Sequence, residues 1–234
     1  MSTATVAGTR PTGHVRDHHS VLAAAEKRLL VWIAHRMPRR INADHLTALG
    51  VLGTAGAGLA FAMARWTPWT LAAVPVCLAI NWFGDSLDGT IARVRHQQRP
   101  RYGFYVDHVV DLVNAVSLFG GLAASGLMQP VLALVLLVAY VLLCAESFLA
   151  THAVGVFRLS FSGVGPTELR ILLAAGALVA IGRPTVTPFG WGPFALFDLG
   201  AAIAAIGMAG AFLISAFRNG RQLYREEPLM ASDR

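Results

Sequence analysis

Six apolar stretches recur along this chain, and polar segments separate them. A helix needs about 20 consecutive apolar residues to cross the hydrocarbon core of a bilayer, and these stretches are close to that length. Only 14% of the residues are charged, whereas soluble proteins contain about 25%. The sequence therefore predicts an all-α integral membrane protein with six transmembrane helices. The predicted spans are residues 46–64, 71–92, 103–127, 130–152, 169–181 and 194–217.

A helix of a different kind is expected before the first span. Leu29, Leu30 and Ile33 fall near one another on a helix over residues 20–40, whereas Lys27 and Arg28 fall largely elsewhere. We interpret it as an amphipathic helix on the membrane surface; a soluble helix packed on a small domain is the alternative. The predicted organisation is a polar tail (1–19), a juxtamembrane helix (20–40), a six-span domain (41–217) and a C-terminal tail (218–234).

The distribution of basic residues predicts the orientation in the membrane. Six spans place both termini on one side, and assigning that side to the cytoplasm leaves only Arg65 and Arg183 outside. Cytoplasmic loops of membrane proteins carry an excess of Lys and Arg, so this orientation follows the general bias. A cytoplasmic membrane face also explains the net charge of +6, and no nucleic-acid partner is expected. We predict a multi-pass protein of the plasma membrane with both termini in the cytoplasm.

The first span is rich in glycine, with Gly50, Gly53, Gly56 and Gly58 close together. No strand precedes them, so a nucleotide-binding loop is disfavoured. Small residues let membrane helices approach closely, and we interpret these glycines as a helix-packing surface.

Four acids stand out where the second span ends and the third begins. Asp85 and Asp88 are three residues apart, and Asp107 and Asp111 are four apart, so each pair shares one face of a helix. The loop between the two spans is short, which predicts antiparallel neighbouring helices whose acidic faces meet. In the predicted orientation both pairs lie at the cytoplasmic surface.

These carboxylates require compensating charge, because ionised side chains are costly within a membrane. Hard oxygen ligands suit Mg²⁺, Mn²⁺ or Ca²⁺, and four of them can hold a pair of ions. A pair of ions is suited to displacement at phosphorus, and Asp111, the acid deepest along its span, is a candidate general base. The acids alone are equally compatible with the ion pathway of a cation transporter.

The residues between the acids favour the enzyme over the transporter. Gly89 and Ala92 are small and leave room for a diphosphate against the helix backbone, and Arg93 adds a fixed positive charge. A transport pathway explains neither these residues nor Gly103 at their spacing.

Eight positions together form a recognisable signature. They read D-x-x-D-G-x-x-A-R followed by G-x-x-x-D-x-x-x-D, and they are Asp85, Asp88, Gly89, Ala92, Arg93, Gly103, Asp107 and Asp111. This pattern resembles the signature of the CDP-alcohol phosphotransferase (CDP-alcohol phosphatidyltransferase) family. The resemblance implies a phospholipid-synthesis enzyme that moves a substituted phosphate from a CDP-linked donor to an alcohol and releases CMP.

The resemblance also implies roles for individual residues. The four aspartates would hold two divalent ions, Mg²⁺ or alternatively Mn²⁺, with Asp111 also acting as the base. Residues 43–47 are similar to a family segment, P-[ND]-x-x-T, although Ala43 stands in place of the proline. Asp44 would then contact the nucleotide; capping of the first span is its alternative role. The implied nucleotide-binding residues are Asp44, Thr47, Asp85, Gly89, Ala92 and Arg93.

The acceptor is less well defined by the sequence. Leu112 follows the last aspartate, where relatives that use phosphorylated inositol or glycerol have an arginine, and Asp107-His108 is similar to choline and ethanolamine phosphotransferases. We expect CDP-diacylglycerol as donor and a small alcohol as acceptor; a lipid acceptor with the reversed polarity is the alternative. The segment before the fifth span supplies the candidate acceptor residues Arg158, Glu168 and Arg170, whose alternative roles are membrane anchoring and helix capping. The resemblance and the small-residue faces favour a homodimer.

Overall fold

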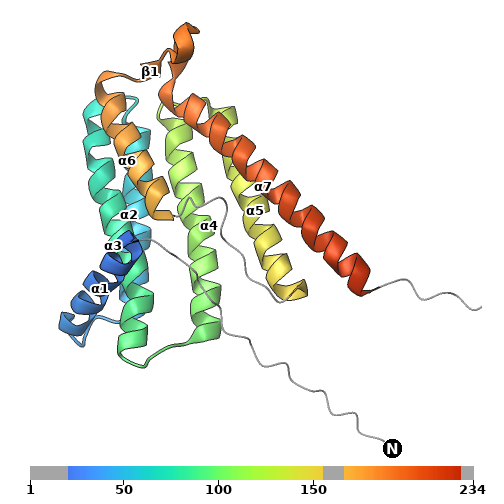
Figure 1. The fold of residues 1–234 in the computed structure, drawn as a ribbon. Helices are drawn as coiled ribbons and strands as arrows, with labels where there is room; N and C mark the ends of the chain where they lie inside the picture. Colours follow the sequence, from blue (N-terminus) through green and yellow to red (C-terminus); the bar gives the residue numbers. More distant parts are fainter. Residues whose placement is uncertain (1–20, 155–165, 228–234) are drawn as a thin grey trace, which may run out of the picture.

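The computed structural model describes residues 21–154 and 166–227, and helices form nearly all of this part (Figure 1). The polar tail, Arg158 and residues 228–234 lie outside it. The elements in chain order are α1 (Val21–Arg36), α2 (Ala43–Met63), η1 (Pro68–Ala72), α3 (Ala73–Val94), α4 (Pro100–Ala124), α5 (Pro130–Ala153), α6 (Pro166–Gly182), β1 (Thr185–Val186), η2 (Pro188–Gly190), β2 (Phe194–Ala195) and α7 (Leu196–Glu226).

The long helices pack side by side in the order α6, α3, α2, α4, α5 and α7. The β1–β2 hairpin lies at one end of this assembly, whereas α1 and the α3–α4 loop lie at the other (Figure 1). The carboxyl ends of α5 and α7 lie at the same end as α1, so the segments with most of the basic residues share one side.

Five helical segments are long and apolar enough to cross a membrane: Ala43–Met63, Pro68–Val94, Pro100–Ala124, Pro130–Ala153 and Leu196–Glu226. The chain is therefore a multi-pass integral membrane protein. The predicted fifth span, α6, has 17 residues, about 26 Å of helix, which is shorter than the roughly 30 Å hydrocarbon core. The all-helical membrane fold is confirmed, and the count of six crossings stays a prediction.

Local sequence explains where the helices begin. Asn42 caps α2: its side-chain oxygen accepts from the backbone N–H of His45 at 3.0 Å, and the His45 ring accepts from the Asn42 N–H at 3.3 Å. Pro100 and Pro130 open α4 and α5, at the position where a missing N–H costs nothing. The predicted sixth span ends at residue 217, but α7 continues through Asn219 and Gly220 to Glu226.

The helix α1 packs across the end of α3. Leu30 and Ala34 are buried against Leu87 and Ile91 of α3. Trp82 of α3 donates its indole N–H to a Glu26 carboxylate oxygen at 2.8 Å. Leu29 and Trp32 stay exposed, which fits the predicted contact of α1 with the membrane surface.

Glycines set how closely α2 approaches its neighbours. A Cβ added at Gly84 of α3 would lie 2.4 Å from the carbonyl oxygen of Leu46, and one at Gly121 of α4 would lie 2.1 Å from that of Gly58. Both contacts are far inside van der Waals distance, so only glycine fits. The predicted packing role of the first-span glycines is confirmed at Gly53 also, where a Cβ would lie 2.6 Å from the Asn81 nitrogen.

The same contacts correct the prediction that α3 and α4 are packed neighbours. Along their described lengths these two helices barely touch, because α2 lies between them and packs closely on both. The buried residues of α4 are Ala115, Leu118, Gly121 and Leu122, all in its second half. The first half of α4 diverges from the bundle, and the acids it carries are exposed. A short loop fixed the antiparallel direction, but the glycine contacts with α2 decided the packing.

Replacing Gly121 by alanine is expected to lower the free energy of unfolding by about 1–3 kcal/mol, because the new methyl group would force α4 away from α2. Chemical unfolding in detergent, followed by tryptophan fluorescence, measures the change. Gly120→Ala is the matched control, since a Cβ there meets nothing within 4 Å. Equal stability of the two variants would contradict the close α2–α4 contact.

Candidate active site

The acid Asp85 of α3 is held by an arginine from a distant part of the chain. The Arg170 guanidinium on α6 donates from Nη2 to Asp85 Oδ2 at 2.6 Å and from Nε to Asn81 Oδ1 at 2.7 Å. Asn81 is buried and donates in turn to the Gly50 carbonyl at 2.9 Å. Asn81 therefore orients the arginine beside Asp85 and also bonds a neighbouring helix.

The second acid of α3, Asp88, is tied to α2. The Thr47 hydroxyl donates to Asp88 Oδ2 at 2.7 Å, and the Gly89 backbone N–H lies 2.5 Å from Oδ1. Thr47 and Asp88 are both half-buried. Two residues expected to bind nucleotide and metal are thus in direct contact, although 41 positions separate them in the chain.

The acids of α4 face the same region from the diverging half of that helix. Asp107 and Asp111 are exposed, and the charge of Asp107 acts on Asp88 across the space between α4 and α3. Within the described residues, however, no three His, Cys, Asp or Glu side chains are close enough to hold a metal ion together. In this structure the four predicted metal ligands therefore form two separate pairs, one on α3 and one on α4.

The donor set itself fits a hard divalent cation. Carboxylate oxygens are the ligands that Mg²⁺ and Mn²⁺ prefer, and in each pair helical spacing turns both carboxylates to one face. With α3 and α4 apart, sharing of ions between the pairs requires a closer approach of the two helices than this structure shows.

Three further polar side chains lie next to the α4 acids. Tyr140 of α5 interacts electrostatically with Asp111, and sequence reasoning missed it because it is one aromatic residue in an apolar run. His108 packs its ring against Phe104, with 4.1 Å between ring centroids, and edge-on against Phe148 of α5. Asn114 lies one turn beyond Asp111, and its buried side-chain oxygen has no hydrogen-bond partner among the described residues.

A cavity of about 410 Å³ lies at the end of α3, about one turn beyond Asp88. It lies between the start of α2, the end of α3 and the loop that follows, and its lining residues are Asn42, Ala43, Asp44, Ile91, Ala92, Arg95, Gln97, Gln98 and Arg99. Two residues predicted to bind nucleotide, Asp44 and Ala92, are among them.

Asp44 makes a 2.5 Å ion pair with Arg99, a residue that sequence reasoning did not single out. Its place in the basic loop between the second and third spans was the only sequence feature that pointed to Arg99.

The remaining predicted nucleotide residues occupy the last turns of α3. The Arg93 guanidinium donates to the Thr90 hydroxyl at 3.1 Å and lies over Gly89, where a Cβ would be 3.3 Å from Nη1. A larger residue at position 89 would therefore crowd this arginine. Of the predicted acceptor residues, Arg170 reaches the acids, Glu168 is exposed near the start of α6, and Arg158 lies outside the described part.

Comparisons with known proteins identify the family of this chain. The family model for CDP-alcohol phosphatidyltransferase matches residues 40–214. Phosphatidylinositol phosphate synthase of Mycobacterium tuberculosis with CDP-DAG bound is 24% identical, with a TM-score of 0.57, and the match covers 87% of this chain and 99% of that chain. Its complex with manganese and citrate is 25% identical, with a TM-score of 0.56 and coverage of 86% and 93%. A search of curated proteins found no match.

The family match covers about three quarters of the chain and includes all four aspartates and the residues between them. It decides between the two chemistries that the acids alone left open, in favour of an enzyme over a transporter. The chain belongs to the CDP-alcohol phosphatidyltransferase family, and it is a multi-pass membrane transferase that moves a substituted phosphate group from a CDP-alcohol to an alcohol.

Proposed function

We propose that the chain transfers a phosphatidyl group from CDP-diacylglycerol to a small alcohol and releases CMP. The reaction would take place at the cytoplasmic face of the plasma membrane, where the basic residues place the α3–α4 loop. A solved relative of the same fold binds CDP-DAG, which supports a CDP-linked lipid as donor. We also propose that the chain forms a homodimer.

The contact between Thr47 and Asp88 is the observation that carries the proposal. Thr47 lies one turn after Asp44, which lines the 410 Å³ cavity, and its hydroxyl reaches a predicted metal ligand at 2.7 Å. A nucleotide in the cavity would therefore have its diphosphate beside the acids of α3. Arg93 and Arg99, at the end of α3 and in the next loop, supply positive charge for the phosphates on the same side.

The proposed cofactor is a pair of Mg²⁺ ions, with Mn²⁺ as the alternative. Asp85, Asp88, Asp107 and Asp111 would hold them, and the ions would neutralise the diphosphate and stabilise charge on the leaving oxygen. Manganese in a solved relative supports the use of a divalent metal. Arg170 forms an ion pair with Asp85 in this structure, so its guanidinium supplies compensating positive charge beside this carboxylate.

In the proposed reaction Asp111 acts on the acceptor. Its carboxylate takes the hydroxyl proton as the acceptor oxygen bonds to the β-phosphorus of the donor. The bond between that phosphorus and the bridging oxygen breaks, and CMP leaves with the oxygen. Exposure of Asp111 on the diverging half of α4 is consistent with access by a polar acceptor.

Arg170 is the described residue best placed to select the acceptor. It is the one predicted acceptor residue seen in contact with the acids, and a guanidinium suits a phosphate or carboxylate. Leu112 still separates this chain from relatives with an arginine after the last aspartate. The reversed polarity, with CDP-choline or CDP-ethanolamine as donor, remains the alternative that His108 suggested.

Asp111→Asn is expected to lower turnover at least 100-fold, the usual contribution of a general base. The assay follows CMP released from CDP-diacylglycerol by the purified protein with inositol phosphate, glycerol phosphate, serine or choline as acceptor. A parallel reaction with CDP-choline and diacylglycerol tests the reversed polarity. Glu227→Gln, an exposed acid beyond the end of α7, is the control and should retain full activity. Wild-type CMP release by a folded, metal-loaded Asp111→Asn variant would contradict the proposal.

Arg170→Ala tests acceptor selection separately from charge compensation. If Arg170 contacts the acceptor, the acceptor KM should rise at least 10-fold, the size of one lost charged hydrogen bond, while the metal concentration for half-maximal rate stays unchanged. Arg183→Ala, a basic residue beyond the end of α6, is the matched control. A changed metal requirement with an unchanged acceptor KM would show that Arg170 serves Asp85 alone.

A further inference from the structure

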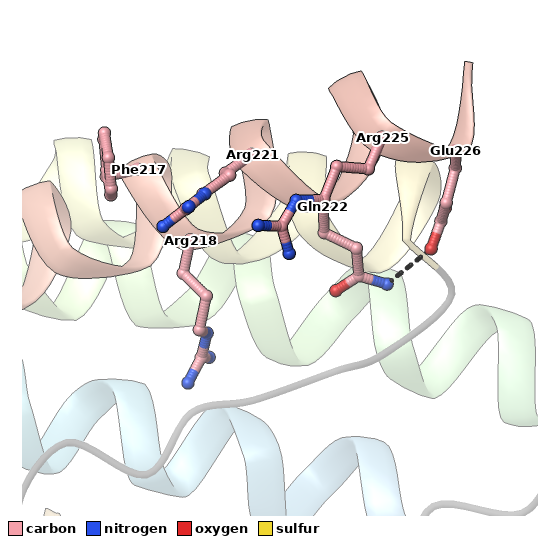
Figure 2. Close-up of a pocket in the computed structure, with 6 residues that line it drawn as sticks. All are labelled: Phe217, Arg218, Arg221, Gln222, Arg225 and Glu226. Carbon is pink, nitrogen blue, oxygen red and sulfur yellow. Dashed lines mark hydrogen bonds between the residues drawn. The ribbon is translucent and has the colours of Figure 1, made fainter. Parts of the chain in front are cut away.

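The last turns of α7 form a basic surface that the transferase chemistry does not use. This helix has 31 residues, whereas about 20 suffice to cross a bilayer. Its extension bears Arg218, Arg221 and Arg225, which follow the spacing of one helical face. With Phe217, Gln222 and Glu226 they line a hollow of about 530 Å³ (Figure 2).

The positive charge of this surface has little compensation within the chain. The three arginines make no ion pair or hydrogen bond with any residue in the described part, although Arg95, Arg99 and Arg170 all do. Glu226, the carboxylate beside them, accepts a hydrogen bond from Gln222 at 2.9 Å (Figure 2). The hollow therefore presents three exposed guanidinium groups to an incoming ligand.

An exposed apolar track leads directly into this basic hollow. Ile214 and Phe217 precede the arginines on the same side of α7 and are 69% and 72% exposed. The side of α7 that faces the bundle is different: Asn219 donates to Glu146 of α5 at 2.7 Å, and Glu146 is buried. This contact holds α7 against α5, while the apolar track and the arginines remain exposed on the other side of the helix.

We propose that this face of α7 binds a phospholipid with an anionic headgroup. The headgroup phosphate would lie among Arg218, Arg221 and Arg225, and an acyl chain would follow Ile214 and Phe217 into the bilayer. A guanidinium donates paired hydrogen bonds to phosphate oxygens, and basic residues next to a membrane attract anionic lipids. A general excess of basic residues on one side explains why arginines occur here, but not why three of them share one face with an apolar track.

The test measures binding of a fluorescent phosphatidylglycerol to the full chain in zwitterionic detergent. The variant Arg218→Gln/Arg221→Gln/Arg225→Gln should bind it about 100-fold more weakly, since each arginine contributes about 1 kcal/mol. Unlabelled phosphatidylglycerol should displace the probe, whereas phosphatidylcholine and inorganic phosphate should not. The thermal midpoint and the transferase activity of the variant report that it is folded.

The matched control removes the same charge elsewhere at the same end of the molecule, in Arg28→Gln/Arg39→Gln/Arg40→Gln, where all three residues are exposed. This control should bind phosphatidylglycerol as the wild type does. An equal loss in both variants would mean that net charge alone attracts the lipid, and would overturn the site. Displacement by inorganic phosphate would overturn the lipid as ligand. Unchanged lipid binding with a changed particle mass would assign the arginines to a protein interface instead.

Discussion

The carboxylates of α3 need polar partners within a largely apolar bundle, and residues of two other helices supply them. Arg170 brings α6 to Asp85, and Thr47 brings α2 to Asp88, at 2.6 Å and 2.7 Å. Asn81 connects the two arrangements, because it accepts from Arg170 and donates to the α2 backbone. The side chains that satisfy these acids are therefore also the ones that join α2, α3 and α6 around them.

Close packing of glycine explains why the site is open on its other side. The contacts Gly84–Gly50 and Gly58–Gly121 fix α2 against both α3 and α4, and α2 then separates the two helices that carry acids. Only the second half of α4 is buried, so Asp107 and Asp111 face the α3 acids without packing against them. This geometry keeps the two pairs of acids apart, with the cavity of about 410 Å³ at the end of α3.

Much of the site was predictable from local spacing, whereas its long-range contacts were not. The aspartates, Gly89, Ala92 and Arg93 lie within one stretch, so helical periodicity alone places them on defined faces. The contact between Arg170 and Asp85 joins residues 85 positions apart, and an arginine beside a membrane has a simpler explanation from charge bias. The insertion of α2 between α3 and α4 was also missed, because a short loop suggests adjacent helices and glycine contacts overrode that expectation. Arg99 belongs to a basic loop but has no pattern that separates it from the other arginines there, and Tyr140 is a single aromatic residue in an apolar run.

Phosphatidyl transfer by this chain is proposed to require divalent metal at the four aspartates. The most direct test measures CMP released from CDP-diacylglycerol by the purified chain, with an acceptor present, as Mg²⁺ or Mn²⁺ is removed with a chelator and then restored. We expect release to stop without metal, to return when metal is added back, and to remain absent in an Asp88→Asn variant at any metal concentration tested. CMP release that continues without divalent metal, or that Asp88→Asn leaves intact, would contradict the account.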